Sequence, residues 1–98
     1  MDTSAKAAIR GKFGSDGVAA WFDFLEMLYD SNGDTYDATE ECDWEVLGVI
    51  MHMNGDQLYD FFDFLSSIGV IDPKRWTKKR HIKLRIQIDE TTKWLFKV

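Results

Sequence analysis

The chain has 98 residues, of which 45% are hydrophobic and 14% aromatic, and its formal net charge is −5. It is long enough for one hydrophobic core, too short for two, and too rich in apolar residues to be disordered. No run approaches the roughly 18 apolar residues of a membrane span, and the N-terminal residues are too polar for a secretory signal. The single cysteine, Cys42, excludes an internal disulfide. We therefore expect a cytoplasmic protein.

Charge is distributed unevenly along the sequence. Up to Pro73 there are 15 acidic and three basic residues, whereas from Lys74 onward there are nine basic and two acidic residues. A basic end on an acidic body is typical of a segment that meets a polyanion. The alternative is that the two parts neutralise each other, within one molecule or between two copies.

The first half of the chain predicts two helices. A short amphipathic helix begins near Ser4 and is weakened or ended by Gly11 and Gly14. After a turn, the central helix of the core extends from Gly17 to Asp30. Its apolar residues cover about 200° of the helical wheel, so several other elements should pack on it.

Two further helices are predicted before residue 70. One begins between Thr39 and Cys42 and ends at His52 or Met53; its apolar spacing turns six side chains inward and leaves Glu45, Gly48 and His52 outside. The inward residues are Trp44, Val46, Leu47, Val49, Ile50 and Met53. The next helix follows the MNGD turn and has an apolar face opposite an acidic one. Its acidic stripe consists of Asp56, Asp60 and Asp63.

The last third of the chain predicts strands. Residues 35–38 can form a short extended piece, and residues 70–72 a short strand that reaches a turn at Pro73. Residues 81–88 alternate with a period of two, so Ile82, Leu84 and Ile86 should face the helices. Residues 93–98 form a second strand of this hairpin. The expected core residues at the centres of the helical stripes are Trp21, Phe22, Leu25, Leu47, Ile50, Phe61 and Leu65.

This order of elements indicates one mainly α domain with a C-terminal β-hairpin, an α+β fold of the winged helix-turn-helix type. The domain covers residues 1–98, with a helical body at about 4–69 and a basic wing or hairpin at about 70–98.

The run IRGKFGSDGVAAWFDFLEMLYDSNG, followed by a Trp-bearing helix and by FFDFLSSIGVID, also resembles a known family. It is similar to the N-terminal winged-helix domain of phage replisome organisers, which are related to the DnaD-like replication initiators. The matching features are the turn at Lys12 to Gly17, the run Phe24 to Glu26, and the IGVID exit of the last helix. Because these motifs are structural, the resemblance implies a fold and a setting in phage or mobile-element DNA replication.

The basic segment is the candidate DNA-binding site. Cations on an accessible surface neutralise phosphates without reading sequence, and an exposed tryptophan can stack on bases. Up to seven such contacts predict a log–log salt slope on the order of −6. The same cations would also solubilise an exposed hairpin and protect its edge from pairing. The candidate residues are Lys74, Arg75, Trp76, Lys78, Lys79, Arg80, Lys83 and Arg85.

The acidic stripe Asp56, Asp60 and Asp63 lies on the candidate recognition helix, where it would be repelled by both DNA strands. We therefore do not expect this helix to read bases. The alternative function is an acidic protein-interaction module, as a homodimer or with a basic partner, that has no nucleic-acid binding of its own. In that alternative the docking surface is this acidic face, the exposed hairpin, or both. The stripe can equally be a solvated face with no partner.

Catalytic patterns are sparse. His52 and His81 are isolated, and the sequence has no phosphate-cradling glycine loop, nucleophile elbow or zinc pattern. We expect a non-enzyme with no catalytic residues, no metal site and no cofactor. The expected partners are DNA, bound largely independently of sequence, or a replication protein, with no membrane involved.

Overall fold

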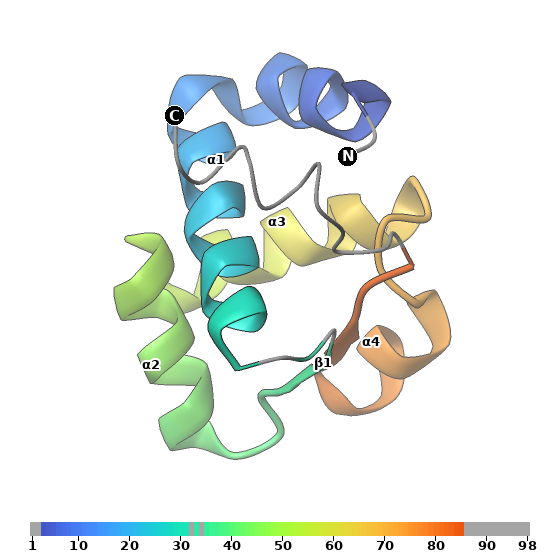
Figure 1. The fold of residues 1–98 in the computed structure, drawn as a ribbon. Coiled ribbons are helices and arrows are strands. Elements are labelled where there is room, and N and C mark those ends of the chain that lie inside the picture. Colours follow the sequence, from blue (N-terminus) through green and yellow to red (C-terminus); the bar gives the residue numbers. More distant parts are fainter. Residues whose placement is uncertain (1–2, 32, 34, 86–98) are drawn as a thin grey trace.

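The computed structural model describes residues 3–31, 33 and 35–85, and it is mainly helical with one two-stranded antiparallel sheet (Figure 1). The expected α+β class is therefore confirmed, while the predicted strand at 93–98 lies outside the described residues. Within those residues, no helix is both long and apolar enough to cross a membrane. The elements are α1 (Thr3–Asp30), β1 (Thr35–Asp37), α2 (Glu41–Met51), α3 (Gly55–Ser67), α4 (Pro73–Lys79) and β2 (His81–Lys83).

Helix α1 consists of two parts that meet at a sharp kink (Figure 1). Gly14 has φ 76° and ψ −165° there, a left-handed conformation that glycine adopts without a steric penalty. The predicted break between two helices is confirmed at Gly14, whereas Gly11 lies inside the first part. Phe13 packs on Phe61 and Phe64 of α3, with ring centroids 5.1 and 5.6 Å apart. These aromatic contacts anchor the N-terminal part of α1 to the body.

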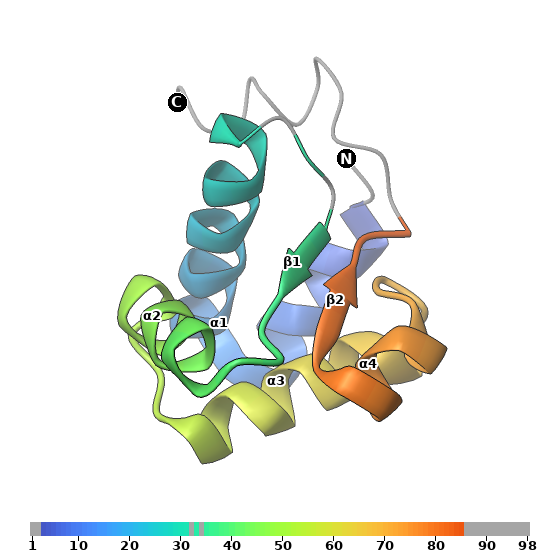
Figure 2. The same cartoon turned by 90° about the horizontal axis from the view of Figure 1, so that it is seen from below.

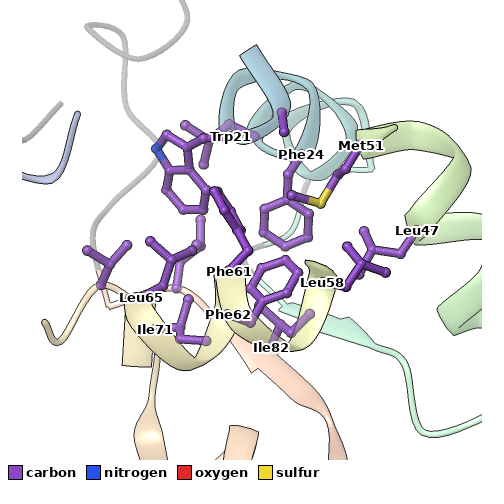
Figure 3. Close-up of a cluster of buried hydrophobic side chains, with 14 of the residues drawn as sticks. Trp21, Phe24, Leu47, Met51, Leu58, Phe61, Phe62, Leu65, Ile71 and Ile82 are labelled. Atoms are coloured by element: carbon purple, nitrogen blue, oxygen red, sulfur yellow. The ribbon is translucent and has the colours of Figure 1, made fainter. Parts of the chain in front are cut away.

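The core lies between the second part of α1, α2, α3 and the sheet (Figure 3). Five predicted core residues are fully or almost fully buried: Trp21, Leu25, Leu47, Phe61 and Leu65. Phe22 and Ile50 are only partly buried and pack against the edge of this cluster. Ile82 and Leu84 are buried as expected, and Ile86 lies outside the described residues.

The sheet brings together segments that are far apart in the sequence (Figure 2). β1 pairs antiparallel with β2, and Tyr36 lies opposite Ile82. On the other side of β2, Ile71 forms an antiparallel bridge with Leu84, and the amide of Arg85 donates to the carbonyl of Val70 at 2.8 Å. Residues 81–85 therefore lie between β1 and residues 70–72.

Helix α2 is rotated relative to the sequence-based prediction. Gly48, expected outside, is buried, whereas Val46 and Val49, expected inside, are 51% and 76% exposed. A Cβ at Gly48 would lie 2.6 Å from the carbonyl oxygen of Met53. The turn into α3 thus passes so close to α2 that only glycine fits, and this contact determines which face of α2 is inside.

Helix α4 occupies residues for which a turn was predicted. The carboxylate of Asp72 caps it by accepting from the amide of Lys74 at 3.0 Å, and Pro73 is its first residue. Arg80, with φ 52°, ends it in a left-handed conformation. The prediction of a simple turn at Pro73 is wrong, because an aspartate followed by proline is also a helix start.

Candidate functional site

The predicted basic residues gather on α4 and β2, at the periphery of the molecule next to α3 (Figures 1 and 2). Residues 74–85 carry seven basic residues and no acidic one. Lys74, Arg75 and Arg85 are exposed. The backbone of Lys78 and Lys79 belongs to α4, and their side chains lie outside the described part.

Trp76 does not offer a stacking surface for bases, so this part of the predicted site is wrong. Its side chain is only 4% exposed. The indole packs against Trp44, Tyr59 and Phe62 with centroid distances of 5.9, 5.7 and 5.5 Å. Its Nε1 donates to Oδ1 of Asp63 at 2.6 Å. Trp76 is the anchor that fixes α4 on the body.

Arg80 has a structural role within the fold. Its guanidinium donates to the carbonyl of Thr39 at 3.0 Å and to the carboxylate of Glu41 at 3.5 Å. It also lies 5.1 Å from the centroid of the Trp44 ring, a cation–π contact. These contacts join the end of α4 to the start of α2, so Arg80 is less available to phosphates than the exposed cations.

Two other basic residues are also partly engaged. Nε of Arg75 lies 3.9 Å from a carboxylate oxygen of Asp72, one helical turn away, although the arginine remains exposed. Lys83 is half-buried within β2, where its carbonyl accepts from the amide of Asp72 at 2.9 Å. Among the basic side chains that the structure describes, Lys74 and Arg85 therefore have the freest access to a phosphate.

The acidic stripe of α3 is exposed, as predicted: Asp56, Asp60 and Asp63 all lie on the surface. Asp63 is engaged by Trp76, so it borders α4 directly. Asp60 lines a groove between α1 and α3. The acidic stripe therefore extends from the basic helix α4, at Asp63, to a second acidic region between α1 and α3, at Asp60.

That second region surrounds His52, and sequence reasoning missed it as a site. Three grooves meet at this residue, and each has carboxylates among its lining residues. Asp23, Glu26 and Asp30 lie on the polar face of the central helix, and nothing in the sequence predicts that they border α2. Their neighbourhood depends on the packing of α1 against α2.

Most acidic side chains of the described residues lie on the surface. No group of three or more His, Cys, Asp or Glu side chains in that part of the chain is positioned to hold a metal ion. Burial raises the pKa of Tyr36, as do the negative charge of Asp43 and the thiol of Cys42. The hydroxyl of Tyr36 donates to the carbonyl of Asp43 at 2.8 Å. This tyrosine connects β1 to α2 and is a structural group.

The described surface thus concentrates cations on α4 and β2, whereas α2, α3 and the part of α1 after Gly14 carry carboxylates and no lysine or arginine. Exposed cations on a helix can neutralise phosphates, and contacts of this kind position a protein on a duplex without specifying its sequence. Comparison with known proteins adds no assignment, since no family model, curated protein or solved structure matches the chain.

Proposed function

We propose that this chain is a winged-helix protein that binds DNA phosphates through α4 and the β2 segment, largely independently of sequence. The order of elements supports the winged-helix part. Helices α2 and α3 are joined by a short turn, and the antiparallel pairing of Ile71 with Leu84 follows them. A helix-turn-helix followed by two paired strands is the order of a winged helix.

The connection between Ile71 and Leu84 would be the wing. This connection consists of helix α4 and the short strand β2. Trp76 fixes it to α2 and α3 by packing against Trp44 and Phe62. The observation that carries the proposal is that residues 74–85, most of this connection and the residue after Leu84, carry seven basic residues and no acidic one, on an exposed helix with a buried anchor. A rigid support reduces the conformational entropy lost when the cations bind phosphates.

The acidic stripe supports binding that does not read bases. A duplex that placed α3 in its major groove would bring its backbones close to Asp56 and Asp60, which are exposed. Charges within the Debye length of about 8 Å at physiological salt repel each other effectively. We therefore propose that the wing contacts the duplex while α3 stays outside the groove.

The biological setting rests on the sequence resemblance to phage replisome organisers. We propose a role in phage-type replication initiation or its control, with DNA or a replication protein as partner. The proposed chemistry is non-catalytic, because phosphate neutralisation requires only accessible cations.

Binding to a short labelled duplex, measured by fluorescence anisotropy at about 50 mM salt, tests the DNA proposal. The variant Lys74→Gln/Lys78→Gln/Lys79→Gln should weaken binding to two unrelated sequences equally, because it removes phosphate contacts and no base contact. Arg80 is left unchanged since it holds α4 to α2. Glutamine is a good helix former, so α4 should persist.

The matched control is Lys6→Gln/Arg10→Gln/Lys12→Gln, which changes the net charge by the same amount on α1. The control should retain most of the affinity. An equal loss in both variants would mean that total charge, and not the wing, determines binding. No binding by the parent chain would reject the proposal.

A further inference from the structure

The outward face of α2 exposes an apolar stripe that the fold does not use. Val46 and Val49 are three residues apart, so they lie on one face of the helix, and they are 51% and 76% exposed. Cys42, also exposed, precedes Val46 by one turn. Valine is a weaker helix former than alanine or glutamate, and here it gains little burial. Stability of the isolated fold therefore does not account for valine at both positions.

Grooves border this stripe on both sides. A groove of about 420 Å³ runs between α1 and α2, where Ile50 and Met27 are apolar and the other lining residues are polar. On the opposite side, a groove of about 680 Å³ is lined by Val49, Trp44 and Leu58 together with polar groups. A third, of about 640 Å³, lies between α1 and α3. His52 lines all three, so the grooves form one continuous surface around the end of α2.

The rim of this surface carries charge of one sign. None of the described residues that line the three grooves is a lysine or an arginine. Negative charges this close together raise the local concentration of a cationic ligand and repel an anionic one. The lining carboxylates are Asp16, Asp23, Glu26, Asp30, Glu41, Glu45 and Asp60.

We infer that this surface binds a basic amphipathic helical segment of another protein. The apolar side of such a segment would cover Val46, Val49 and Ile50, with its side chains at a spacing of three and four residues packing across the α2 stripe. Lysine and arginine side chains along its flanks would extend their apolar stems over the valines and reach the carboxylates of α1 and α2. This site is separate from the wing and does not depend on DNA binding.

The probe is a labelled peptide of leucine and lysine whose leucines have helical spacing. A peptide of the same composition with scrambled order has the same charge but no apolar face. The parent chain should bind the amphipathic peptide at least about tenfold more tightly than the scrambled one, because only the former matches the stripe. Equal affinities would show that charge alone attracts the peptide and would overturn the proposal.

Substitution of the two exposed valines of α2 tests whether the peptide binds on the apolar stripe. Val46→Ser/Val49→Ser should weaken binding of the amphipathic peptide about tenfold, and circular dichroism should show an unchanged fold because both side chains are exposed. The control is Ile68→Ser, which removes a 40% exposed apolar side chain that lines none of the three grooves. An equal loss in the control would overturn the proposal.

The carboxylates give an independent test. Asp23→Asn/Glu26→Gln should weaken peptide binding and reduce its salt dependence, whereas Glu40→Gln/Asp56→Asn, exposed carboxylates outside the grooves, should have a smaller effect. The valine variant should bind duplex DNA like the parent chain, so failure of this proposal and failure of the DNA proposal are distinguishable. The parent chain should not self-associate through this face. If it does, and Val46→Ser/Val49→Ser abolishes the self-association, the apolar stripe of α2 binds a second copy of the chain, and the proposal of another protein as partner is overturned.

Discussion

The indole Nε1 of Trp76 donates a 2.6 Å hydrogen bond to Oδ1 of Asp63, and this contact ties α4 to α3. Sequence reasoning expected the tryptophan to stack on bases and the aspartate to dock a partner. Within the fold the two residues bind each other, so the cations of α4 have a fixed position relative to the acidic stripe. The hydrogen bond between Trp76 and Asp63 therefore joins the basic helix α4 directly to the acidic face of α3.

Removal of the acceptor should destabilise the fold measurably. Asp63→Ala leaves the nearly buried Trp76 Nε1 without its partner, and we expect a loss of about 1 to 2 kcal/mol in the free energy of unfolding. The control is Asp60→Ala, one turn earlier on the same exposed face, which should change stability by less than about 0.5 kcal/mol. Urea unfolding monitored by tryptophan fluorescence measures both. Equal effects would show that the hydrogen bond contributes nothing to stability.

The position of α2 depends on Gly48. Gly48→Ala should destabilise the fold by about 1 to 3 kcal/mol although alanine is the better helix former, because its Cβ would lie 2.6 Å from the carbonyl of Met53. At Gly11 a Cβ meets nothing within 4 Å, so Gly11→Ala should gain up to about 1 kcal/mol. Thermal or urea unfolding of the two variants tests whether Gly48→Ala lowers and Gly11→Ala raises the free energy of unfolding. A stable Gly48→Ala would contradict the close approach of α2 and the turn into α3.

Tyr36 predicts a pH dependence on the alkaline side. Burial raises its pKa above the ordinary 10.0, so above that pH the unfolded chain releases the proton while the folded chain still holds it. The unfolded state then binds fewer protons, and stability falls as the pH rises through the folded pKa. Tyr36→Phe also loses the hydrogen bond to the carbonyl of Asp43. We expect this loss to lower the free energy of unfolding by about 0.5 to 1.5 kcal/mol at neutral pH.

The difference in unfolding free energy between the parent chain and Tyr36→Phe should therefore shrink between about pH 8 and about pH 10.5. Comparison of the two chains cancels the titration of the other tyrosines, the cysteine and the lysines. Urea unfolding at both pH values gives the difference. A difference that stays constant would show that Tyr36 ionises equally in the folded and unfolded chains.

The local signals of the sequence predicted the helical body well. The break at Gly14 and the central helix are confirmed. Both predictions depend on signals from residues that are close in the sequence, namely glycine and helical periodicity. The start of α3 depends on an equally local signal, a capping box in which Asn54 and Gln57 satisfy each other's backbone amides. Short-range physics determines these features.

The incorrect predictions concern contacts that apolar periodicity does not contain. Pairing of Tyr36 with Ile82 joins residues that are 46 positions apart in the sequence, and no turn pattern indicates it. Trp76 belongs to a seven-residue helix, too short for periodicity to show which side faces inward. The rotation of α2 depends on one backbone contact at Gly48 that apolar spacing does not contain.

Neutralisation of the acidic stripe should strengthen DNA binding by the wing. Asp60→Asn/Asp63→Asn removes two negative charges next to α4, and the amide oxygen at position 63 can still accept from Trp76. We expect duplex affinity to rise about twofold per charge at about 50 mM salt. Glu26→Gln on α1 is the control and should change affinity less. Loss of DNA affinity in the double variant would contradict the proposed position of the duplex.

The salt dependence of duplex binding by the unmodified chain tests the central claim most directly. With Arg80 engaged inside the fold and Lys83 half-buried in β2, up to five basic residues of residues 74–85 remain for phosphates. The logarithm of the association constant should then fall linearly with the logarithm of salt concentration, with a slope of about −3 to −5 and the same value for two unrelated sequences. A slope near zero, or no detectable binding to single- or double-stranded DNA at about 50 mM salt, would contradict a wing that binds phosphates.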